Sequence, residues 1–348
     1  MKPHTTLSSS RDLRLVIIGF GVVGQSFAKL LLSRSADLYS QHGIKPRIVA
    51  CVDNSGSAVA AGGLDLKRLL EAKKAKGTVG AYDKGNTKFD SLEVIEKMEA
   101  EVMLECTPTN LNDGEPATSH ITAAMRSQKH VICINKGPLA LAFPSLIELA
   151  NYNGVMLRFS GTVGGGTPIL EFAKRCLKGD RIISFHGILN GTTNYILSKM
   201  EEGRTYETAM QDAKAKGYTE ANPSLDVDGF DAAAKLVIMA NWIMGMKVTM
   251  KDIQRNGIVD IGLSDVKNAA ERGNAVKLLA VCDSRRLHVA PTEIAKTDPL
   301  YVNGTLNAVT FSSEHSGQQT IIGRGAGGME TASAMLRDLI EIRDARFS

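Results

Sequence analysis

Short apolar runs and longer periodic stretches alternate along the first part of the chain. Residues 13–19 (LRLVIIG) form a run that is apolar and β-branched apart from Arg14 and is closed by glycine, which is typical of a strand buried on both faces. From Gly24 the segment GQSFAKLLLSR places apolar residues at helical spacing, and residues 47–52 (RIVACV) predict a second strand that ends at Asp53. The pattern predicts one β-α-β unit.

The alternation continues to about residue 151. It predicts strands at residues 102–106 and 131–135 and helices near residues 120–127 and 145–151. Strands that alternate with helices favour a parallel, doubly wound sheet with helices on both faces.

The pattern changes beyond about Val155. A longer strand pattern occupies residues 181–191 (RIISFHGILNG). Helical patterns follow at residues 209–216, 231–242 and 329–342. The predicted fold class is therefore α/β, with an N-terminal Rossmann dinucleotide-binding domain, a second α+β domain, and a C-terminal helix that returns to the first domain. The expected domains are residues 1–155 together with 320–348, and residues 156–319.

Composition agrees with two globular domains, since 348 residues exceed the size at which a single core keeps growing. The 41 basic and 37 acidic residues are dispersed, without the dense basic stripe that follows a phosphate backbone, so nucleic acid is not an expected partner. The five cysteines have no CxxC spacing, and the sequence shows no signal peptide and no run long enough to span a bilayer. We therefore expect a cytoplasmic protein with reduced thiols and no membrane partner.

A GxGxxG motif lies between the first predicted strand and the following helix. Gly19 permits a tight turn, Gly21 lets the backbone approach a pyrophosphate, and Gly24 allows close packing of helix on strand. The motif predicts that NAD or NADP is the cofactor, and a tight turn without a ligand is the alternative. The motif residues are Gly19, Phe20, Gly21, Val22, Val23 and Gly24.

Asp53 ends the second predicted strand, where a carboxylate can accept hydrogen bonds from the adenosine ribose of NAD. The nearby polar residues could still accommodate the 2′-phosphate of NADP, so the choice of cofactor stays open. The alternative is that Asp53 caps a turn in DNSG. These polar residues are Asn54, Ser55, Lys67 and Arg68.

Two polar clusters, ECTPT at residues 105–109 and NKGP at residues 135–138, follow predicted strands. Ligands of open parallel sheets collect at the carboxyl ends of strands, so we expect Thr107 and Thr109 on the nicotinamide side, Pro108 at the cofactor, and Lys136 near a substrate carboxylate. Ordinary loop residues are the alternative.

Several acidic residues precede the strongly apolar helix predicted at residues 231–242. Asp231 and Lys235 are four residues apart and so share a helix face. Reducing an aldehyde requires a proton for the developing alkoxide, and a lysine oriented by a carboxylate can supply it. An exposed ion pair is the alternative. Glu220 and Asp226 either hold a substrate ammonium or are solvated loop acids.

Seven motifs resemble the homoserine dehydrogenase family, in its short form without a C-terminal regulatory domain, over nearly the whole chain. The resemblance implies NAD(P)-dependent interconversion of L-homoserine and L-aspartate 4-semialdehyde in threonine and methionine biosynthesis. The alternatives are another amino-acid-linked Rossmann oxidoreductase and a non-catalytic nicotinamide sensor. The motifs are GFGVVG, ECTPT, NKGPLA, GTVGGGTPIL, GILNGTTNYIL, GYTEANPSLDVDGFDAAAKL and GRGAGGMETASAMLRDLI.

The resemblance also implies roles for individual residues. Lys235 would transfer the proton, with Asp231 beside it and Lys136 near cofactor and substrate. The amino-acid head would be bound by Glu220, Asp226, Gly191 and Thr192, and the cofactor would be lined by Thr107, Gly217 and Gly327.

The family holds a monovalent cation, usually sodium, at a loop that corresponds to residues 160–167. The implied ligands are Val163, Gly165 and Thr167, although Ser160 stands where many relatives have glutamate. A homodimer through the sheet of the second domain is also implied, so this domain is expected to be both catalytic and dimerising.

Overall fold

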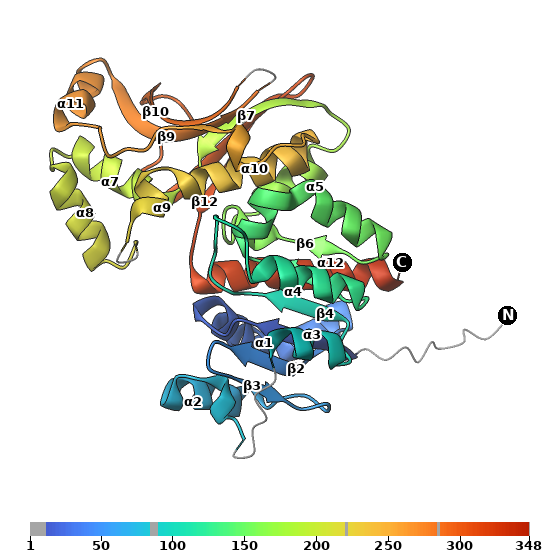
Figure 1. Ribbon diagram of the computed structural model, residues 1–348. Helices are drawn as coiled ribbons and strands as arrows, with labels where there is room; N and C mark the ends of the chain where they lie inside the picture. Colours follow the sequence, from blue (N-terminus) through green and yellow to red (C-terminus); the bar gives the residue numbers. More distant parts are fainter. Residues whose placement is uncertain (1–11, 84–89, 220–221, 284–285, 348) are drawn as a thin grey trace.

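The computed structural model describes residues 12–83, 90–219, 222–283 and 286–347, which form two six-stranded sheets (Figure 1). The first sheet has the strand order β3-β2-β1-β4-β5-β6, and all neighbours are parallel except the β2–β3 pair. This order confirms the predicted Rossmann sheet. Its strands are β1 (Asp12–Ile18), β2 (Lys45–Asp53), β3 (Gly56–Val59), β4 (Val102–Glu105), β5 (His130–Cys133) and β6 (Leu157–Arg158).

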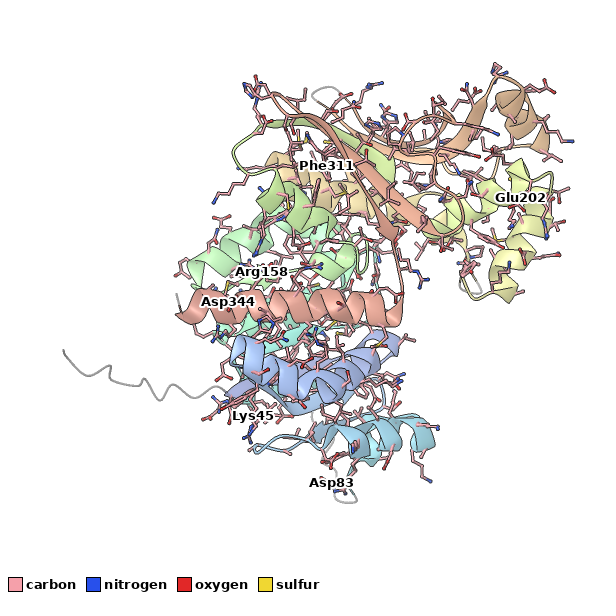
Figure 2. The ribbon with its side chains drawn as sticks, turned by 180° about the vertical axis from the view of Figure 1, so that it is seen from behind. Lys45, Asp83, Arg158, Glu202, Phe311 and Asp344 are labelled. Atoms are coloured by element: carbon pink, nitrogen blue, oxygen red, sulfur yellow. The ribbon has the colours of Figure 1, made fainter. Side chains whose placement is uncertain are left out.

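Helices cover both faces of the first sheet. The helix α12 (Gly328–Phe347) returns from the far end of the sequence and packs beside α1, as Figures 1 and 2 both show. Its apolar residues share a core with β1 and α1, which confirms the predicted return of the C-terminal helix. The other helices of this part are α1 (Val22–His42), α2 (Leu66–Lys76), α3 (Ser91–Lys97), α4 (Ala117–Arg126) and α5 (Lys136–Tyr152).

The second sheet is antiparallel except for its β8–β10 edge, in the order β12-β11-β7-β9-β10-β8. Its strands are β7 (Ile182–Ile188), β8 (Gln254–Arg255), β9 (Asn274–Cys282), β10 (Leu287–Ala295), β11 (Leu306–Ser313) and β12 (Gly317–Arg324). The helices of this part are α6 (Ile169–Glu171), α7 (Gly191–Glu201), α8 (Tyr206–Ala215), α9 (Ser224–Val227), α10 (Phe230–Met244) and α11 (Leu263–Glu271).

One continuous apolar core joins the two sheets. It extends from the first sheet through α5 and α10, which lie between the sheets, to β7 and β9 (Figure 1). The partly buried Trp242 of α10 packs edge-on against Phe159 of this core, with 5.2 Å between ring centroids, and against Phe143 of α5 at 6.4 Å. The two halves are therefore interlocked, although their division at residues 155 and 320 stays a prediction.

Helix α5 is longer than the pattern at residues 145–151 predicts. It begins at Lys136 because the Asn135 side chain caps it and accepts a hydrogen bond from the Gly137 amide at 2.9 Å. Ala142 has non-helical dihedral angles just before Pro144, and this kink hides the first half of the helix in the sequence. None of the helices within the described ranges is long and apolar enough to cross a membrane.

Candidate active site

A cavity of about 1590 Å³ opens where the carboxyl ends of β1, β2 and β4 face the second part of the chain. Its wall carries the predicted cofactor residues on one side and the acidic and lysine residues on the other. The predicted residues that line it are Gly19, Phe20, Gly21, Val22, Val23, Asp53, Thr107, Pro108, Lys136, Gly191, Thr192, Gly217, Asp226, Asp231, Lys235 and Gly327.

The GFGVVG turn has the geometry that a dinucleotide requires. Gly19 has φ +95°, and a Cβ there would lie 2.5 Å from the carbonyl carbon of Cys106. A Cβ on Gly24 would lie 2.6 Å from the Gly19 carbonyl oxygen, so side chains are excluded at both positions. At Gly21, by contrast, no described atom lies within 4 Å of such a Cβ. The N-terminus of α1 therefore faces open space that suits a pyrophosphate.

The Asp53 carboxylate is turned toward the protein, and its side chain is only 4% exposed. Burial favours the neutral acid, but the Lys73 ammonium and nearby backbone amides outweigh it and lower the pKa of Asp53. A carboxylate has about four lone-pair sites, and all four are used here, so a ribose role for Asp53 stays a prediction. The donors are Lys73 Nζ at 2.7 Å, the Val79 amide at 2.8 Å, Thr78 Oγ1 at 2.9 Å and the Ser55 amide at 3.0 Å.

Asp231 lies between two ammonium groups on the opposite wall. Its Oδ2 is 2.7 Å from Lys235 Nζ on the same helix, and its Oδ1 is 3.4 Å from Lys136 Nζ at the start of α5. Lys235 is 7% exposed and also donates to the Leu189 carbonyl oxygen at 2.7 Å. The structure thus brings together the three predicted catalytic side chains, which lie on two different helices, α5 and α10.

The charges of this cluster shift its acids in opposite directions. Burial alone would raise the pKa of Asp231, but Lys235 and Lys136 hold it well below its usual value. Burial raises the pKa of Asp226, and the neighbouring Asp231 charge raises it further. The cavity therefore holds one firmly ionised carboxylate and a second that would gain from a cationic ligand.

Asn190 connects these two acids and was not predicted from the sequence. Its Nδ2 donates to Asp226 Oδ1 at 2.7 Å and to Asp231 Oδ2 at 2.9 Å, and its side chain also caps α7. Thr192 in the first turn of α7 donates to the Tyr218 carbonyl oxygen at 2.7 Å. This hydrogen bond holds the loop next to Gly217 against α7. Glu220, predicted to bind the substrate, lies outside the described residues.

Comparisons with known proteins agree with this geometry. Residues 168–340 match the family model described as homoserine dehydrogenase, and residues 1–132 match one described as glutamate/leucine/phenylalanine/valine dehydrogenase. The chain is 43% identical to a homoserine dehydrogenase of Methanocaldococcus jannaschii, over 94% of this chain and 98% of that protein. The chain belongs to the homoserine dehydrogenase family.

Solved homoserine dehydrogenases share the whole fold. The structure from Archaeoglobus fulgidus has a TM-score of 0.88 at 38% identity and covers 95% of this chain and 99% of that one. A hyperthermophilic archaeal homoserine dehydrogenase in complex with NADPH has a TM-score of 0.84 at 27% identity and covers 97% and 99%. An NAD(+)-dependent homoserine dehydrogenase of Pseudomonas canavaninivorans is 36% identical over 96% of this chain and 97% of that protein. Both forms of the cofactor therefore occur among its homoserine dehydrogenase relatives.

The loop predicted to hold sodium has two carboxylates beside Ser160. Ser160 Oγ lies within hydrogen-bond distance of Glu171 Oε1 and Asp338 Oδ1, and the Ser160 amide donates to Asp338 Oδ2 at 3.0 Å. Negative charge is therefore present next to this loop although residue 160 is serine. Val163 is fully buried, and the Thr167 hydroxyl donates to the Arg324 carbonyl oxygen at 3.1 Å. The sodium site itself, including Gly165, stays a prediction.

Proposed function

We propose that this homoserine dehydrogenase relative interconverts L-homoserine and L-aspartate 4-semialdehyde, with NAD or NADP as the cofactor. The observation that carries the proposal is the joint position of the Lys235, Asp231 and Lys136 cluster and the GFGVVG turn on the walls of one cavity. Curated relatives with this name are 43% and 36% identical over nearly the whole chain.

Lys235 is the proposed proton donor to the carbonyl oxygen of the semialdehyde. The bound nicotinamide cofactor would supply the hydride for this reduction. Two of the three N–H groups of the Lys235 ammonium donate to Asp231 and to the Leu189 carbonyl oxygen. Among the described residues the third has no protein partner, and Lys235 lines the cavity. In the opposite direction the neutral amine of Lys235 would accept the proton of the homoserine hydroxyl.

The remaining groups are suited to the amino-acid head of the substrate. A substrate ammonium would compensate the buried charge of Asp226, whose pKa is raised by burial. The N-terminus of α7, at Gly191 and Thr192, favours an anion and would attract the substrate carboxylate. Glu220 is proposed to assist at the ammonium.

A cytoplasmic location and a homodimer through the second sheet are also part of the proposal. Ile183 of β7 and Ile322 of β12 are exposed apolar side chains on two strands of this sheet, and such residues support a protein contact there.

The Lys235→Met variant tests the proton-transfer role. We expect kcat for homoserine oxidation, followed as nicotinamide absorbance with NAD or NADP, to fall by about 10²-fold or more, since general acid-base groups contribute this much. The dissociation constant of the reduced cofactor should change less than about threefold, because cofactor binding alone involves no proton transfer to the substrate. Lys97→Met is the matched control, because Lys97 is an exposed lysine paired with Glu93 on α3. Near-normal kcat in Lys235→Met would contradict the role, and binding without homoserine turnover in the unaltered protein would contradict the function.

A further inference from the structure

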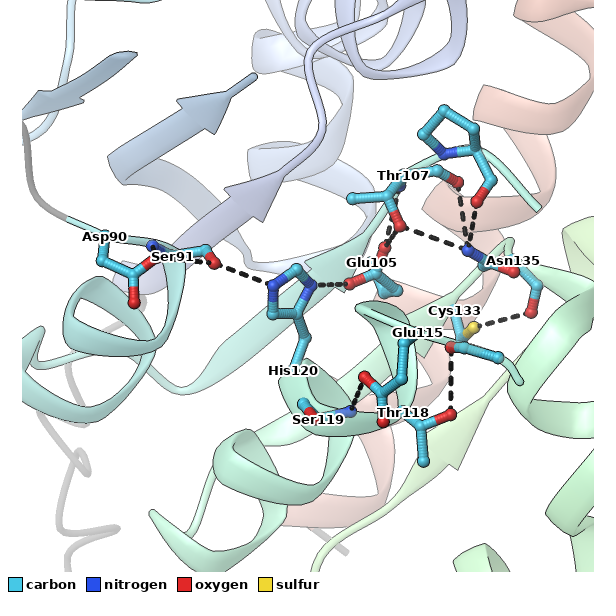
Figure 3. A network of polar contacts seen from close by, with 12 residues as sticks. Asp90, Ser91, Glu105, Thr107, Glu115, Thr118, Ser119, His120, Cys133 and Asn135 are labelled. Carbon is cyan, nitrogen blue, oxygen red and sulfur yellow. Dashed lines mark hydrogen bonds and ion pairs between the residues drawn. The ribbon is translucent and has the colours of Figure 1, made fainter. Parts of the chain in front are cut away.

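A buried acid-imidazole pair lies in the first part of the chain and is not used by the proposed proton transfer. Glu105 ends β4 and is 0% exposed, and His120 of α4 is 3% exposed. His120 Nδ1 is 2.8 Å from Glu105 Oε2, and His120 Nε2 is 2.8 Å from the hydroxyl of Ser91 (Figure 3). Burying such a pair is costly unless each polar atom has a partner. The partners of Glu105 and His120 therefore indicate which part of the structure the pair holds in place.

The other oxygen of Glu105 is directed at Thr107, the predicted cofactor residue. Glu105 Oε1 accepts a hydrogen bond from the Thr107 amide at 2.8 Å and another from the Thr107 hydroxyl. The carboxylate oxygen accepts in both contacts, and both hydrogens belong to Thr107. The hydroxyl hydrogen of Thr107 therefore points at Glu105 and away from the cavity.

Asn135 fixes the Thr107 hydroxyl from a second side. Its Oδ1 accepts from the Gly137 amide at 2.9 Å, so its amino group must face the ECTPT segment. There Nδ2 donates to the Pro108 carbonyl oxygen at 2.9 Å and lies 3.2 Å from both the carbonyl oxygen and the Oγ1 of Thr107 (Figure 3). Thr107 Oγ1 has two lone pairs, and among the described residues Asn135 is the one donor that reaches them. One lone pair thus remains for a ligand in the cavity that Thr107 lines.

We propose that Glu105, held by His120, is a positioning residue that makes Thr107 a fixed hydrogen-bond acceptor for the carboxamide of a bound nicotinamide ring. This inference rests on the proposed function, because it assumes a nicotinamide cofactor at the carboxyl end of β4. The carboxamide carries the N–H groups of the nicotinamide half of the cofactor. Because the Thr107 hydroxyl hydrogen is directed at Glu105, Thr107 Oγ1 can only accept from the ligand, and it therefore favours the carboxamide orientation in which an N–H faces Thr107. That orientation decides which face of the ring is turned toward Lys235 on the opposite wall.

The test uses the contrast between NADH and reduced 3-acetylpyridine adenine dinucleotide, in which a methyl group replaces the carboxamide nitrogen. Dissociation constants are measured by titration calorimetry without homoserine. In Thr107→Val we expect the dissociation constant of NADH to rise about fivefold to tenfold, the effect of one neutral hydrogen bond, while that of the analogue changes less than about twofold. Thr107→Ser keeps the hydroxyl and should bind both compounds nearly as the unaltered protein does.

A pair of Glu105 variants tests the positioning role. Glu105→Gln presents a carbonyl oxygen to Thr107 and its amino group to His120, which can accept in its other tautomer, so NADH binding should stay within about threefold. Glu105→Leu removes the acceptor and should reproduce the selective loss of Thr107→Val. If Glu105→Leu does not fold, Glu105→Gln decides the positioning role, because a loss of NADH binding well beyond about threefold in this variant would contradict it.

Two results would overturn the inference: equal weakening of NADH and the analogue in Thr107→Val, or no weakening of either. The titrations contain no homoserine, so they measure cofactor binding even if the protein does not turn homoserine over. The activity assay therefore tests the proposed function, and the titrations separately test this inference.

Discussion

Two buried carboxylates of the cavity wall, Asp53 and Asp231, are neutralised in different ways. Asp231 has two ammonium groups and an amide as partners, and all of them lie in the cavity wall. Within the described residues Asp53 has Lys73 as its one cationic partner, and its other donors are backbone amides and a hydroxyl. If Asp53 lies at the adenosine end of the cofactor, as the sequence predicts, the charge that it presents there depends on Lys73.

The Lys73→Met variant should change the choice of cofactor. Lys73 is 16% exposed at its side chain and lines the cavity next to Asp53, so its loss removes the positive charge that compensates the Asp53 carboxylate. If a 2′-phosphate binds at this end of the cavity, we expect kcat/KM for NADP to fall about tenfold relative to that for NAD, since an uncompensated like charge nearby costs on the order of 1 to 2 kcal/mol. The ratio of the two cofactors in one variant cancels any loss of folded protein. An unchanged ratio would show that the adenosine end does not sense Asp53.

At the scale of elements, the β1-α1 turn separates residues needed for packing from one needed for a ligand. Gly24 must approach the Gly19 carbonyl oxygen, whereas Gly21 faces open space. Gly21→Ala should therefore fold with a melting temperature within about 3 °C of the unaltered protein, because Ala for Gly at an N-cap costs less than about 1 kcal/mol. It should bind NADH at least about tenfold more weakly, because the added methyl group occupies the pyrophosphate space.

Gly24→Ala is the matched comparison for this turn. Its methyl group would meet the Gly19 carbonyl oxygen at 2.6 Å, so α1 must shift and the variant should lose thermal stability before any ligand is added. Differential scanning calorimetry with and without NADH distinguishes the two variants. Equal stability loss in both would mean that the turn has no spare space for a ligand.

Local spacing explains which elements and site residues could be predicted from the sequence. The glycine motif and the Asp231–Lys235 pair each lie within one turn and its flanks, and the structure places both in the cavity. Asn190 was missed because its partners Asp226 and Asp231 are 36 and 41 residues away. The first half of α5 was also missed, although Asn135 is one of the residue types that commonly cap the start of a helix.

At the scale of the whole molecule, Asp338 joins segments from distant parts of the sequence. It lies on α12, and Ser160 and Glu171 approach it from the chain between the two sheets. The Ser160 hydroxyl has one hydrogen, so it can donate to one of the two carboxylates and must accept from the other, which then carries a proton. Burial and the nearby Glu171 charge accordingly raise the pKa of Asp338 to about 7.

This proton gives the stability of the protein a defined dependence on pH. In the unfolded chain an aspartic acid loses its proton near pH ~4, so between about pH 4 and pH 7 the folded state holds more protons than the unfolded state. The free energy of unfolding should therefore decrease as pH rises through this window and level off above it, by a total on the order of 2 to 4 kcal/mol from this group.

Asp338→Asn should remove that contribution. The Asn amino group can donate to Ser160 Oγ as the protonated acid does, and its oxygen can accept from the Ser160 amide. Urea unfolding at pH 5 and pH 8 should show the variant more stable than the unaltered protein at about pH 8 and similar to it at about pH 5. A variant that is less stable at both values would mean that the ionised carboxylate is required there.

The return of α12 has a consequence for the order in which the protein folds during synthesis. Met335, Leu339 and Ile342 fill the same core as Leu15 and Ile17 of β1, more than 300 residues earlier in the chain. The ribosome releases the N-terminus first, yet this nucleotide-binding half cannot complete its core until α12 has emerged from the exit tunnel. The half made first is therefore the half finished last, and the apolar face that α12 covers stays exposed while the second sheet is translated.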